Sequence, residues 1–187
     1  MKKSLLFVVL AVLLTVSSVF AQDMGIQIIS GSSAAAETVN LDDLKIGTEA
    51  EIDGFGIIKF TDFQFLNSFW RKNDGTISSG KEADYAILWA DLTNTTFSAK
   101  NYLDGAEVKI FFDDSYEFGG WSYQRDLNWS GAKEDVIRKS DQFAIDPFYQ
   151  GHYIFGSTLP NFVVSSTAPL KMVITLDGNE LTYNIRK

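Results

Sequence analysis

Residues 170–186, LKMVITLDGNELTYNIR, decide the fold class of this 187-residue chain. Apolar side chains occupy every second position from Leu170 to Leu176 and again from Leu181 to Ile185, with Asp177-Gly178 between the two runs. A two-residue period is typical of β-strands that bury one face, and Asp-Gly favours a type I′ turn, which needs positive φ at both residues. This stretch therefore predicts an antiparallel β-hairpin.

The same alternation recurs toward the N-terminus. Residues 108–112 and 116–123 predict a second hairpin around Asp113-Asp114-Ser115. Residues 85–92 are apolar at both odd and even positions, which predicts a central strand buried on both faces. In residues 57–66 the apolar positions change phase, which predicts a β-bulge near Thr61-Asp62. With one more strand at 149–155, about seven strands are expected, at a spacing typical of a β-sandwich.

Residues 124–147 depart from this pattern because they show no β alternation. Residues 132–139 could form a short helix of two turns, with Ser130 as its N-cap. Loops this long in a folded domain are usually functional or mobile. We therefore expect an all-β fold with one long loop that could hold a short helix.

The first 21 residues are typical of a secretory signal peptide. Lys2 and Lys3 precede an apolar run over residues 5–16, and Val19-Phe20-Ala21 puts small residues before a cleavage site at Gln22. The run is shorter than the roughly 20 residues of a membrane span. We expect a signal peptide at 1–21, a flexible leader at 22–40, a folded domain at 41–187, and an extracellular protein without a membrane span.

Composition excludes several functional classes. The chain is 45% hydrophobic with 3 Pro and no Cys, which is typical of a folded protein without disulfides, lipid-bearing cysteine or thiolate ligands. The chain ends at Arg186-Lys187 without a hydrophobic tail, and no wall-sorting signal is expected. Its formal net charge is −8, and removing residues 1–21 with their two Lys lowers it to −10. Such a charge argues against nucleic acid or an anionic lipid surface as the partner.

Motifs for catalysis and cofactors are incomplete. Residues 75–81 fit the phosphate-loop pattern G-x-x-x-x-G-K, but Glu82 stands where Ser or Thr would hold magnesium, so a polar loop between strands is expected. His152 is the single histidine, and without G-x-S-x-G no nucleophile accompanies it. We expect it to face solvent or to form a hydrogen bond at a strand edge. No catalytic residue, metal site or cofactor is predicted, and the chain is not expected to be an enzyme.

Acidic pairs leave two alternatives open. Asp42-Asp43 and Asp113-Asp114 are typical of solvated turns, although a glycoside hydrolase would need two such carboxylates across a cleft. Asp113, Asp114 and Glu117 could also bind calcium, although no EF-hand loop is present.

Aromatic residues give the candidate ligand site. Trp121 and Tyr123 share one strand face, and Trp129 follows in the long loop. Exposed aromatic rings can stack on sugars, whereas buried rings fill sandwich cores, as we expect of Trp70 and Trp89. Trp121, Tyr123 and Trp129 are therefore candidate ligand-binding residues.

The chain also resembles a family of secreted Gram-positive bacterial proteins of unknown function that carry an immunoglobulin-like β-sandwich. The resemblance covers about residues 41–187 and rests on the segments IG (46–47), VKIFFDD (108–114), YEFGGW (116–121), GHYIFG (151–156), TLPN (158–161) and DGNEL (177–181). It implies an immunoglobulin-like antiparallel β-sandwich and no catalytic residues.

Three functional hypotheses follow. The first is a secreted, non-enzymatic module that contacts a protein or a cell surface through its sheet edges and the loop at 124–147. The second is a glycan-binding module that uses Trp121, Tyr123 and Trp129. The third is a hydrolase with an unidentified pair of carboxylates.

Overall fold

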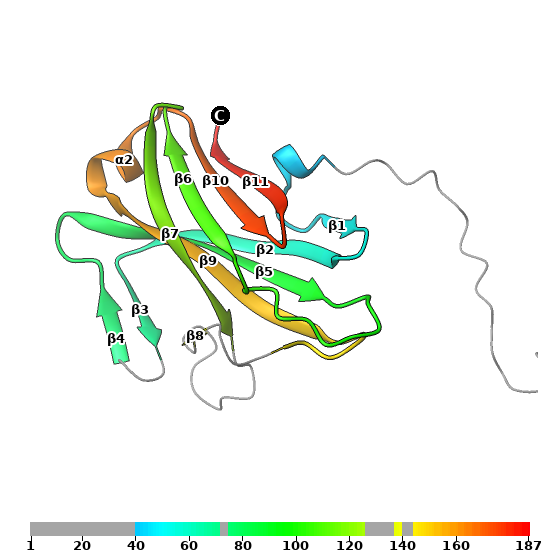
Figure 1. Cartoon of the computed structure of the whole chain (residues 1–187). Helices are drawn as coiled ribbons and strands as arrows, with labels where there is room; N and C mark the ends of the chain where they lie inside the picture. Colours follow the sequence, from blue (N-terminus) through cyan, green and yellow to red (C-terminus); the bar gives the residue numbers. More distant parts are fainter. Residues whose placement is uncertain (1–39, 72–74, 126–136, 140–143) are drawn as a thin grey trace, which may run out of the picture. The chain divides into compact units, whose positions relative to one another are not determined.

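A computed structural model describes residues 40–71, 75–125, 137–139 and 144–187 of the chain. Most of the strands form a continuous antiparallel ladder in the order β1-β2-β5-β9-β7-β6-β10-β11 (Figure 1). Strand β8 also pairs with β7 but is not part of this order. The predictions for residues 1–39 lie outside the described part of the chain. The strands of the ladder are β1 (Glu49–Ile52), β2 (Gly56–Leu66), β5 (Ala83–Thr93), β6 (Glu107–Phe112), β7 (Tyr116–Arg125), β8 (Ile137–Lys139), β9 (Gln150–Pro160), β10 (Leu170–Leu176) and β11 (Asn179–Arg186).

Strand β7 divides this ladder into two layers. Its residues 116–119 pair with β6, whereas residues 120–125 pair with β9. Gly120 lies at the change of partner, where a Cβ would come within 2.5 Å of the Gly156 carbonyl oxygen. We call β1, β2, β5, β9, β8 and the second half of β7 the larger sheet, and the first half of β7 with β6, β10 and β11 the smaller sheet.

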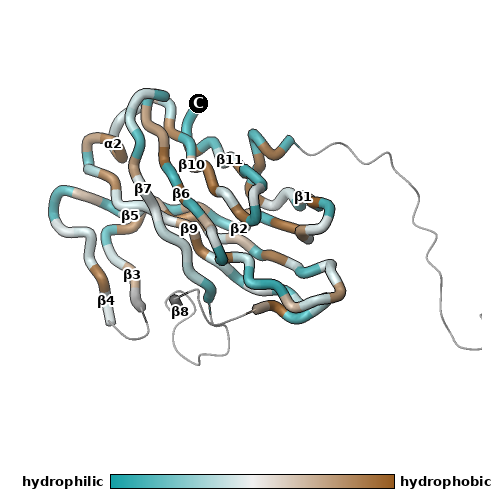
Figure 2. Tube along the Cα trace, in the orientation of Figure 1, coloured by the Kyte–Doolittle hydropathy of each residue, from teal (hydrophilic) through white to brown (hydrophobic). Residues whose placement is uncertain are grey.

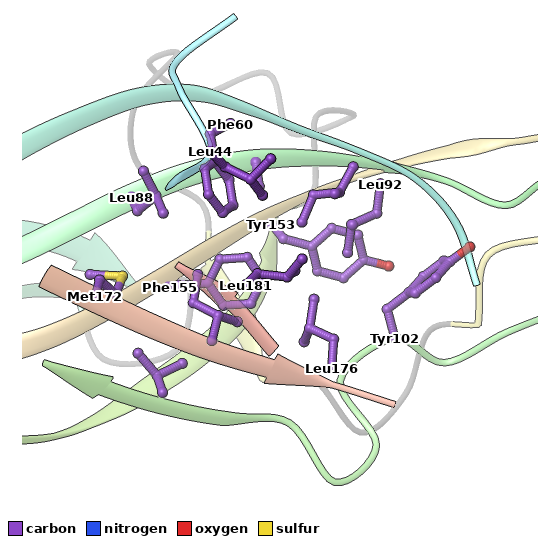
Figure 3. Close-up of a cluster of buried hydrophobic side chains, with 14 of the residues drawn as sticks. Leu44, Phe60, Leu88, Leu92, Tyr102, Tyr153, Phe155, Met172, Leu176 and Leu181 are labelled. Atoms are coloured by element: carbon purple, nitrogen blue, oxygen red, sulfur yellow. The ribbon is translucent and has the colours of Figure 1, made fainter. Parts of the chain in front are cut away.

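The hydrophobic core fills the space between the two sheets. Hydrophobic and hydrophilic residues alternate along β6, as expected for a strand with one buried face (Figure 2). In Figure 3, side chains of the larger sheet meet side chains of the smaller sheet in one cluster that includes Phe60, Leu88, Tyr153, Phe155, Met172, Leu176 and Leu181. The fold is an antiparallel β-sandwich, as the alternation predicted.

Both predicted hairpins are confirmed. Strands β10 and β11 pair around Asp177 and Gly178, whose φ values of 50° and 78° fit the predicted type I′ turn. Strands β6 and β7 are joined through Asp113 and Asp114, which also adopt positive φ.

The predictions for the central strands are confirmed as well. Strand β5 lies between β2 and β9 and is buried on both faces. The register of β2 against β5 shifts between Phe60 and Asp62, which is the predicted bulge. Beyond the bulge, Asp62 and Gln64 oppose Trp89 and Ile87 on the face of the larger sheet that points away from the core, which we call its outer face.

Several predictions about secondary structure are wrong. The described residues hold strands β1 through β11, more than the predicted number of about seven. Ile137–Lys139 pairs with β7 as strand β8 instead of ending a helix, and residues 126–136 lie outside the described part. The short α-helix is α2 (Asn161–Ser165), which follows β9, and a 3₁₀ turn, η1 (Leu41–Asp43), precedes β1. Pairing with a neighbouring strand outweighs weak local preference in such short segments.

Residues 75–81 also differ from the polar loop that was expected there. Gly75–Ser78 forms strand β4, which pairs only with β3 (Ser68–Arg71) as a separate two-stranded hairpin. Phe69 and Ile77 are directly opposite in this hairpin and pack on the outer face of the larger sheet.

Within the described residues, no helix has the length and apolar character that crossing a membrane requires.

Candidate binding groove on the outer face of the larger sheet

The outer face of the larger sheet carries a second hydrophobic cluster. The register aligns its side chains because residues directly opposite in an antiparallel pair point to the same side. The β3–β4 hairpin covers part of this cluster with Phe69 and Ile77. The other members are Leu66, Tyr85, Ile87, Trp89, Trp121, Tyr123 and Ile154.

Two of the three predicted ligand-binding residues belong to this cluster. Trp121 and Tyr123 share a strand face, as expected, with their ring centroids 5.1 Å apart. The Trp121 ring also contacts Phe69 at 5.3 Å and Tyr85 at 6.3 Å, so much of its surface is taken up by packing. Trp129 lies outside the described residues. A ligand-binding role for Trp121, Tyr123 and Trp129 stays a prediction.

A groove of about 440 Å³ opens next to this cluster. Its apolar lining residues are Leu66, Phe69 and Trp89. Its polar lining residues are Thr61, Asp62, Gln64, Ser68 and Arg125. The volume lies within the roughly 300–1,000 Å³ range of small-molecule sites.

The bulge in β2 supplies the polar side of this groove. The Asp62 carboxylate accepts hydrogen bonds from the Phe63 amide at 2.8 Å and from Gln64 Nε2 at 2.7 Å. These bonds fix both side chains beside Trp89, the direct cross-strand partner of Asp62. Sequence reasoning expected Trp89 to lie in the core and missed this site, although the phase change at residues 60–63 was the signal for it.

The single histidine lies farther along the same face. His152 on β9 opposes Asp91 on β5, with 2.5 Å between His152 Nδ1 and Asp91 Oδ1, and both side chains are partly buried. Because a carboxylate only accepts hydrogen bonds, Nδ1 carries the proton in this pair. Lys59 lies opposite Asp91 and Arg125 lies opposite His152 in the cross-strand register. Asp91 therefore has the Lys59 cation on one neighbouring strand and the His152 ring on the other, and an opposite-charge pair such as Lys59 and Asp91 stabilises a sheet.

One carboxylate of each acidic pair is engaged with lysine. Lys171 donates to Asp114 at 2.8 Å, and Asp43 accepts from Lys45 and Lys187. Hydrogen bonds from Lys187, Lys45 and Asn184 hold the pKa of Asp43 well below its usual range. Among the residues that the structure describes, no group of three His, Asp or Glu side chains is placed to hold a metal ion.

A second hollow, of about 770 Å³, lies on the outer face of the smaller sheet. Its cations are paired there, since Lys171 binds Asp114 and Lys109 lies 3.1 Å from Glu107 and 3.6 Å from Glu117. Alternating ion pairs of this kind are typical of the solvated face of an antiparallel sheet. The groove beside Trp89 therefore has the stronger features of a ligand site.

Two solved structures resemble this chain. An uncharacterized β-sandwich protein from Clostridium difficile 630 gives a TM-score of 0.64 at 19% sequence identity, over 80% of this chain and 97% of that protein. A conserved hypothetical protein from Bacillus anthracis gives a TM-score of 0.50 at 10% identity, over 76% of this chain and 95% of that one. No protein-family model and no curated protein matches the chain.

These likenesses bear on the fold alone. They confirm the predicted similarity to β-sandwich proteins of unknown function from Gram-positive bacteria. The immunoglobulin-like type of sandwich and the secretion of the chain stay predictions.

Proposed function

We propose that the chain is a secreted, non-enzymatic binding module that contacts a cell-surface glycan through the groove beside Trp89. The observation that carries this proposal is the combination of an indole with a carboxylate, an amide and a guanidinium in one groove. The apolar face of a sugar ring packs on an aromatic ring. The hydroxyl groups at the edge of the sugar ring need hydrogen-bond partners, which planar polar side chains supply. Trp89 supplies the first feature, and Asp62, Gln64 and Arg125 supply the second.

The non-enzymatic part of the proposal rests on the carboxylates of the groove. Glycoside hydrolysis uses two carboxyl groups on opposite sides of the scissile bond. Among the described residues that line the groove, Asp62 is the one carboxylate, and both of its oxygens already accept hydrogen bonds. The His152 ring is held by Asp91 on the neighbouring strand. The groove is therefore better suited to binding than to acid–base chemistry.

Secretion is supported by the pattern of residues 1–21, with two lysines, an apolar run and small residues before Gln22. Because the sequence has no cysteine, a secreted form would rely on its hydrophobic core and not on disulfides.

Contact through the sheet edges is less well supported by the structure. At one edge, the Leu44 amide donates to the Thr182 carbonyl of β11, so the segment after η1 covers part of that strand. At the other edge, β1 has four residues, and its Glu49 and Glu51 are exposed. Short, charged or covered edges resist the addition of a partner strand.

The test is binding of soluble polysaccharides to the chain from Gln22 onward, the form expected after cleavage. The described residues begin at Asn40, so this truncation removes none of them. Affinity electrophoresis against a panel of neutral and acidic polysaccharides should identify at least one that retards the protein. Trp89→Ala should abolish that retardation, and Gln64→Ala should weaken it.

A control variant distinguishes the effect of changing the groove from the effect of removing an aromatic ring elsewhere on the surface. Phe162→Ala removes an exposed ring on α2 and should leave the retardation unchanged. A reducing-end assay on the retarding polysaccharide should show no release of sugar. Retardation by no polysaccharide, or equal retardation of the Trp89→Ala variant, would overturn the glycan proposal, and enzymatic release of sugar would overturn its non-enzymatic part.

A further inference from the structure

Three aromatic side chains project into solvent from two loops of the sandwich. Phe97 lies between β5 and β6 and is 91% exposed, whereas Phe148 and Tyr149 immediately precede β9 and are 63% and 69% exposed. The Phe97 and Phe148 rings meet edge to face, with their centroids 5.4 Å apart. We call Phe97, Phe148 and Tyr149 the aromatic tip.

The turn that presents Phe148 goes against local backbone preference. The Tyr149 amide donates to the Asp146 carbonyl, which places Pro147 and Phe148 at the two central positions. Phe148 has a φ of 66°, a value that its position in the turn normally reserves for Gly or Asn. Strained residues of this kind persist where the surroundings hold them, and they concentrate at functional sites.

A buried asparagine holds the two loops together. Asn94 is fully buried, and its Nδ2 donates to the carbonyls of Ser98 and Ile145, which lie on the two loops. Its backbone donates to the Tyr149 carbonyl and accepts from the Phe148 amide. Hydrogen bonds to Asn94 therefore hold the backbone of both loops where they present the aromatic tip.

The residues around the aromatic tip favour a partner that is apolar and carries no net charge. Neither residues 94–99 nor residues 147–151 include a charged side chain, and the charged residue next to them on the Phe148 side is the exposed Asp146 at the start of the turn. Lys100, the cation that follows Ser98-Ala99, is engaged by the Gly54 carbonyl at 3.0 Å and by Asp177 at 2.7 Å. A ring that is 91% exposed, as that of Phe97 is, has little contact with the protein, so a partner that buries it would have to surround it.

We infer that the aromatic tip inserts into the interface of a neutral lipid bilayer. Tyr and other amphipathic rings are enriched at the boundary between lipid headgroups and acyl chains, and phenylalanine buries its apolar surface below it. The formal charge of −8 opposes binding to anionic lipid, which is why a zwitterionic surface is the expected partner. This inference goes beyond the glycan proposal and shares no residue with the groove.

The test uses the cysteine-free sequence for site-specific labelling of the chain from Gln22 onward, which lacks the apolar run of residues 5–16. Ser98→Cys carries an environment-sensitive fluorophore at the tip, and Ser115→Cys carries it on the exposed turn between β6 and β7. Phosphatidylcholine vesicles should shift the emission of the Ser98 label to the blue and leave the Ser115 label unchanged.

Two further variants test the ring itself. Phe97→Ser in the Ser98-labelled protein should weaken vesicle binding by about 10-fold or more, since burial of one phenylalanine ring corresponds to at least that factor. Phe162→Ser, which removes a ring that is 65% exposed on α2, should have no effect.

Three outcomes would overturn the inference. The first is the absence of a blue shift with phosphatidylcholine, and the second is a shift that appears only after phosphatidylglycerol is added. The third is a shift that grows with protein concentration without vesicles, because it would identify a second copy of the chain as the partner. None of these measurements involves polysaccharide, so failure here and failure of the glycan proposal are distinguishable.

Discussion

The indole of Trp121 lies directly over Gly156 on the outer face of the larger sheet. The two residues are cross-strand partners on β7 and β9, and a Cβ built at Gly156 would come within 2.5 Å of Trp121 Cη2. Phe69 of the β3–β4 hairpin contacts the same indole. Glycine at position 156 therefore lets the Trp121 indole lie close to the sheet, and the indole in turn supports the hairpin that forms one wall of the groove.

Gly156→Ala is expected to destabilise the protein by about 1–3 kcal/mol, because the added methyl group must displace a packed ring. Urea unfolding should show the lower midpoint, and tryptophan emission should shift to the red as Trp121 gains exposure. Gly119→Ala is the matched control, since a Cβ at Gly119 meets no atom within 4 Å. Equal stability of the two variants would show that the Trp121 ring is free to move away.

Strands could be predicted from the sequence where the alternation of apolar and polar residues was long enough to show which face of the strand is buried. Strands β10 and β11 have clear turn residues between them, and β5 is apolar at consecutive positions, which only a strand buried on both sides can accommodate. Strands β3 and β8 span only four and three residues. Their existence depends on pairing partners that local sequence cannot specify.

The candidate groove could be predicted only in part. The shared face of Trp121 and Tyr123 followed from their spacing of two residues, and the bulge followed from the phase change in β2. The position of Asp62 beside Trp89 depends on the register of β2 against β5 after the bulge. A shift by one residue would turn Asp62 to the other face, so the phase change in the sequence indicates the bulge but does not identify Trp89 as the neighbour of Asp62.

Tyr102→Phe is expected to cost about 1–2 kcal/mol of unfolding free energy. The Tyr102 hydroxyl is buried and donates to the Phe55 carbonyl at 2.9 Å, so its removal leaves a buried acceptor without that partner. Tyr153→Phe is the matched control, because the buried Tyr153 hydroxyl has no hydrogen-bond partner among the residues that the structure describes. Urea unfolding should show that Tyr153→Phe is neutral or stabilising. An equal loss in both variants would contradict the hydrogen bond to Phe55.

The raised pKa of Tyr102 predicts how the stability of the protein changes at alkaline pH. Burial, assisted by the charge of Asp177, raises the pKa of Tyr102 from 10.0 to about 12. The folded protein therefore holds this proton more tightly than the unfolded chain, and stability falls as pH rises from about 10 to about 12. Below this window Tyr102 contributes no pH dependence. Urea midpoints measured across the window should decline less steeply in Tyr102→Phe, and an identical slope would contradict the raised pKa.

Asp43→Asn is expected to loosen the segment that covers the edge of β11. Lys187 and Lys45 stabilise the charged form of Asp43, so its contribution is present above the unfolded pKa of about 4 and disappears as pH falls further. At neutral pH the variant should show faster hydrogen exchange of the Leu44 amide, which donates to Thr182. Asp42→Asn, with the same charge change one residue earlier, should leave that exchange rate unchanged; similar acceleration in both variants would rule out a specific role for Asp43.

Asn94→Asp is expected to lower the unfolding free energy by roughly 2–4 kcal/mol at neutral pH, because buried carbonyls lose their donor and face a carboxylate instead. The amide of Asn94 donates to the Ser98 and Ile145 carbonyls, whereas its Oδ1 accepts from Thr96. Burial raises the pKa of the new carboxyl group, and its protonation restores one donor, so stability should recover as pH falls toward 4. Asn67→Asp, at an exposed position, should show neither the loss nor the recovery in urea unfolding. If Asn94→Asp were as stable as Asn67→Asp at pH 7, the two loops of the aromatic tip would have to be held by contacts other than Asn94.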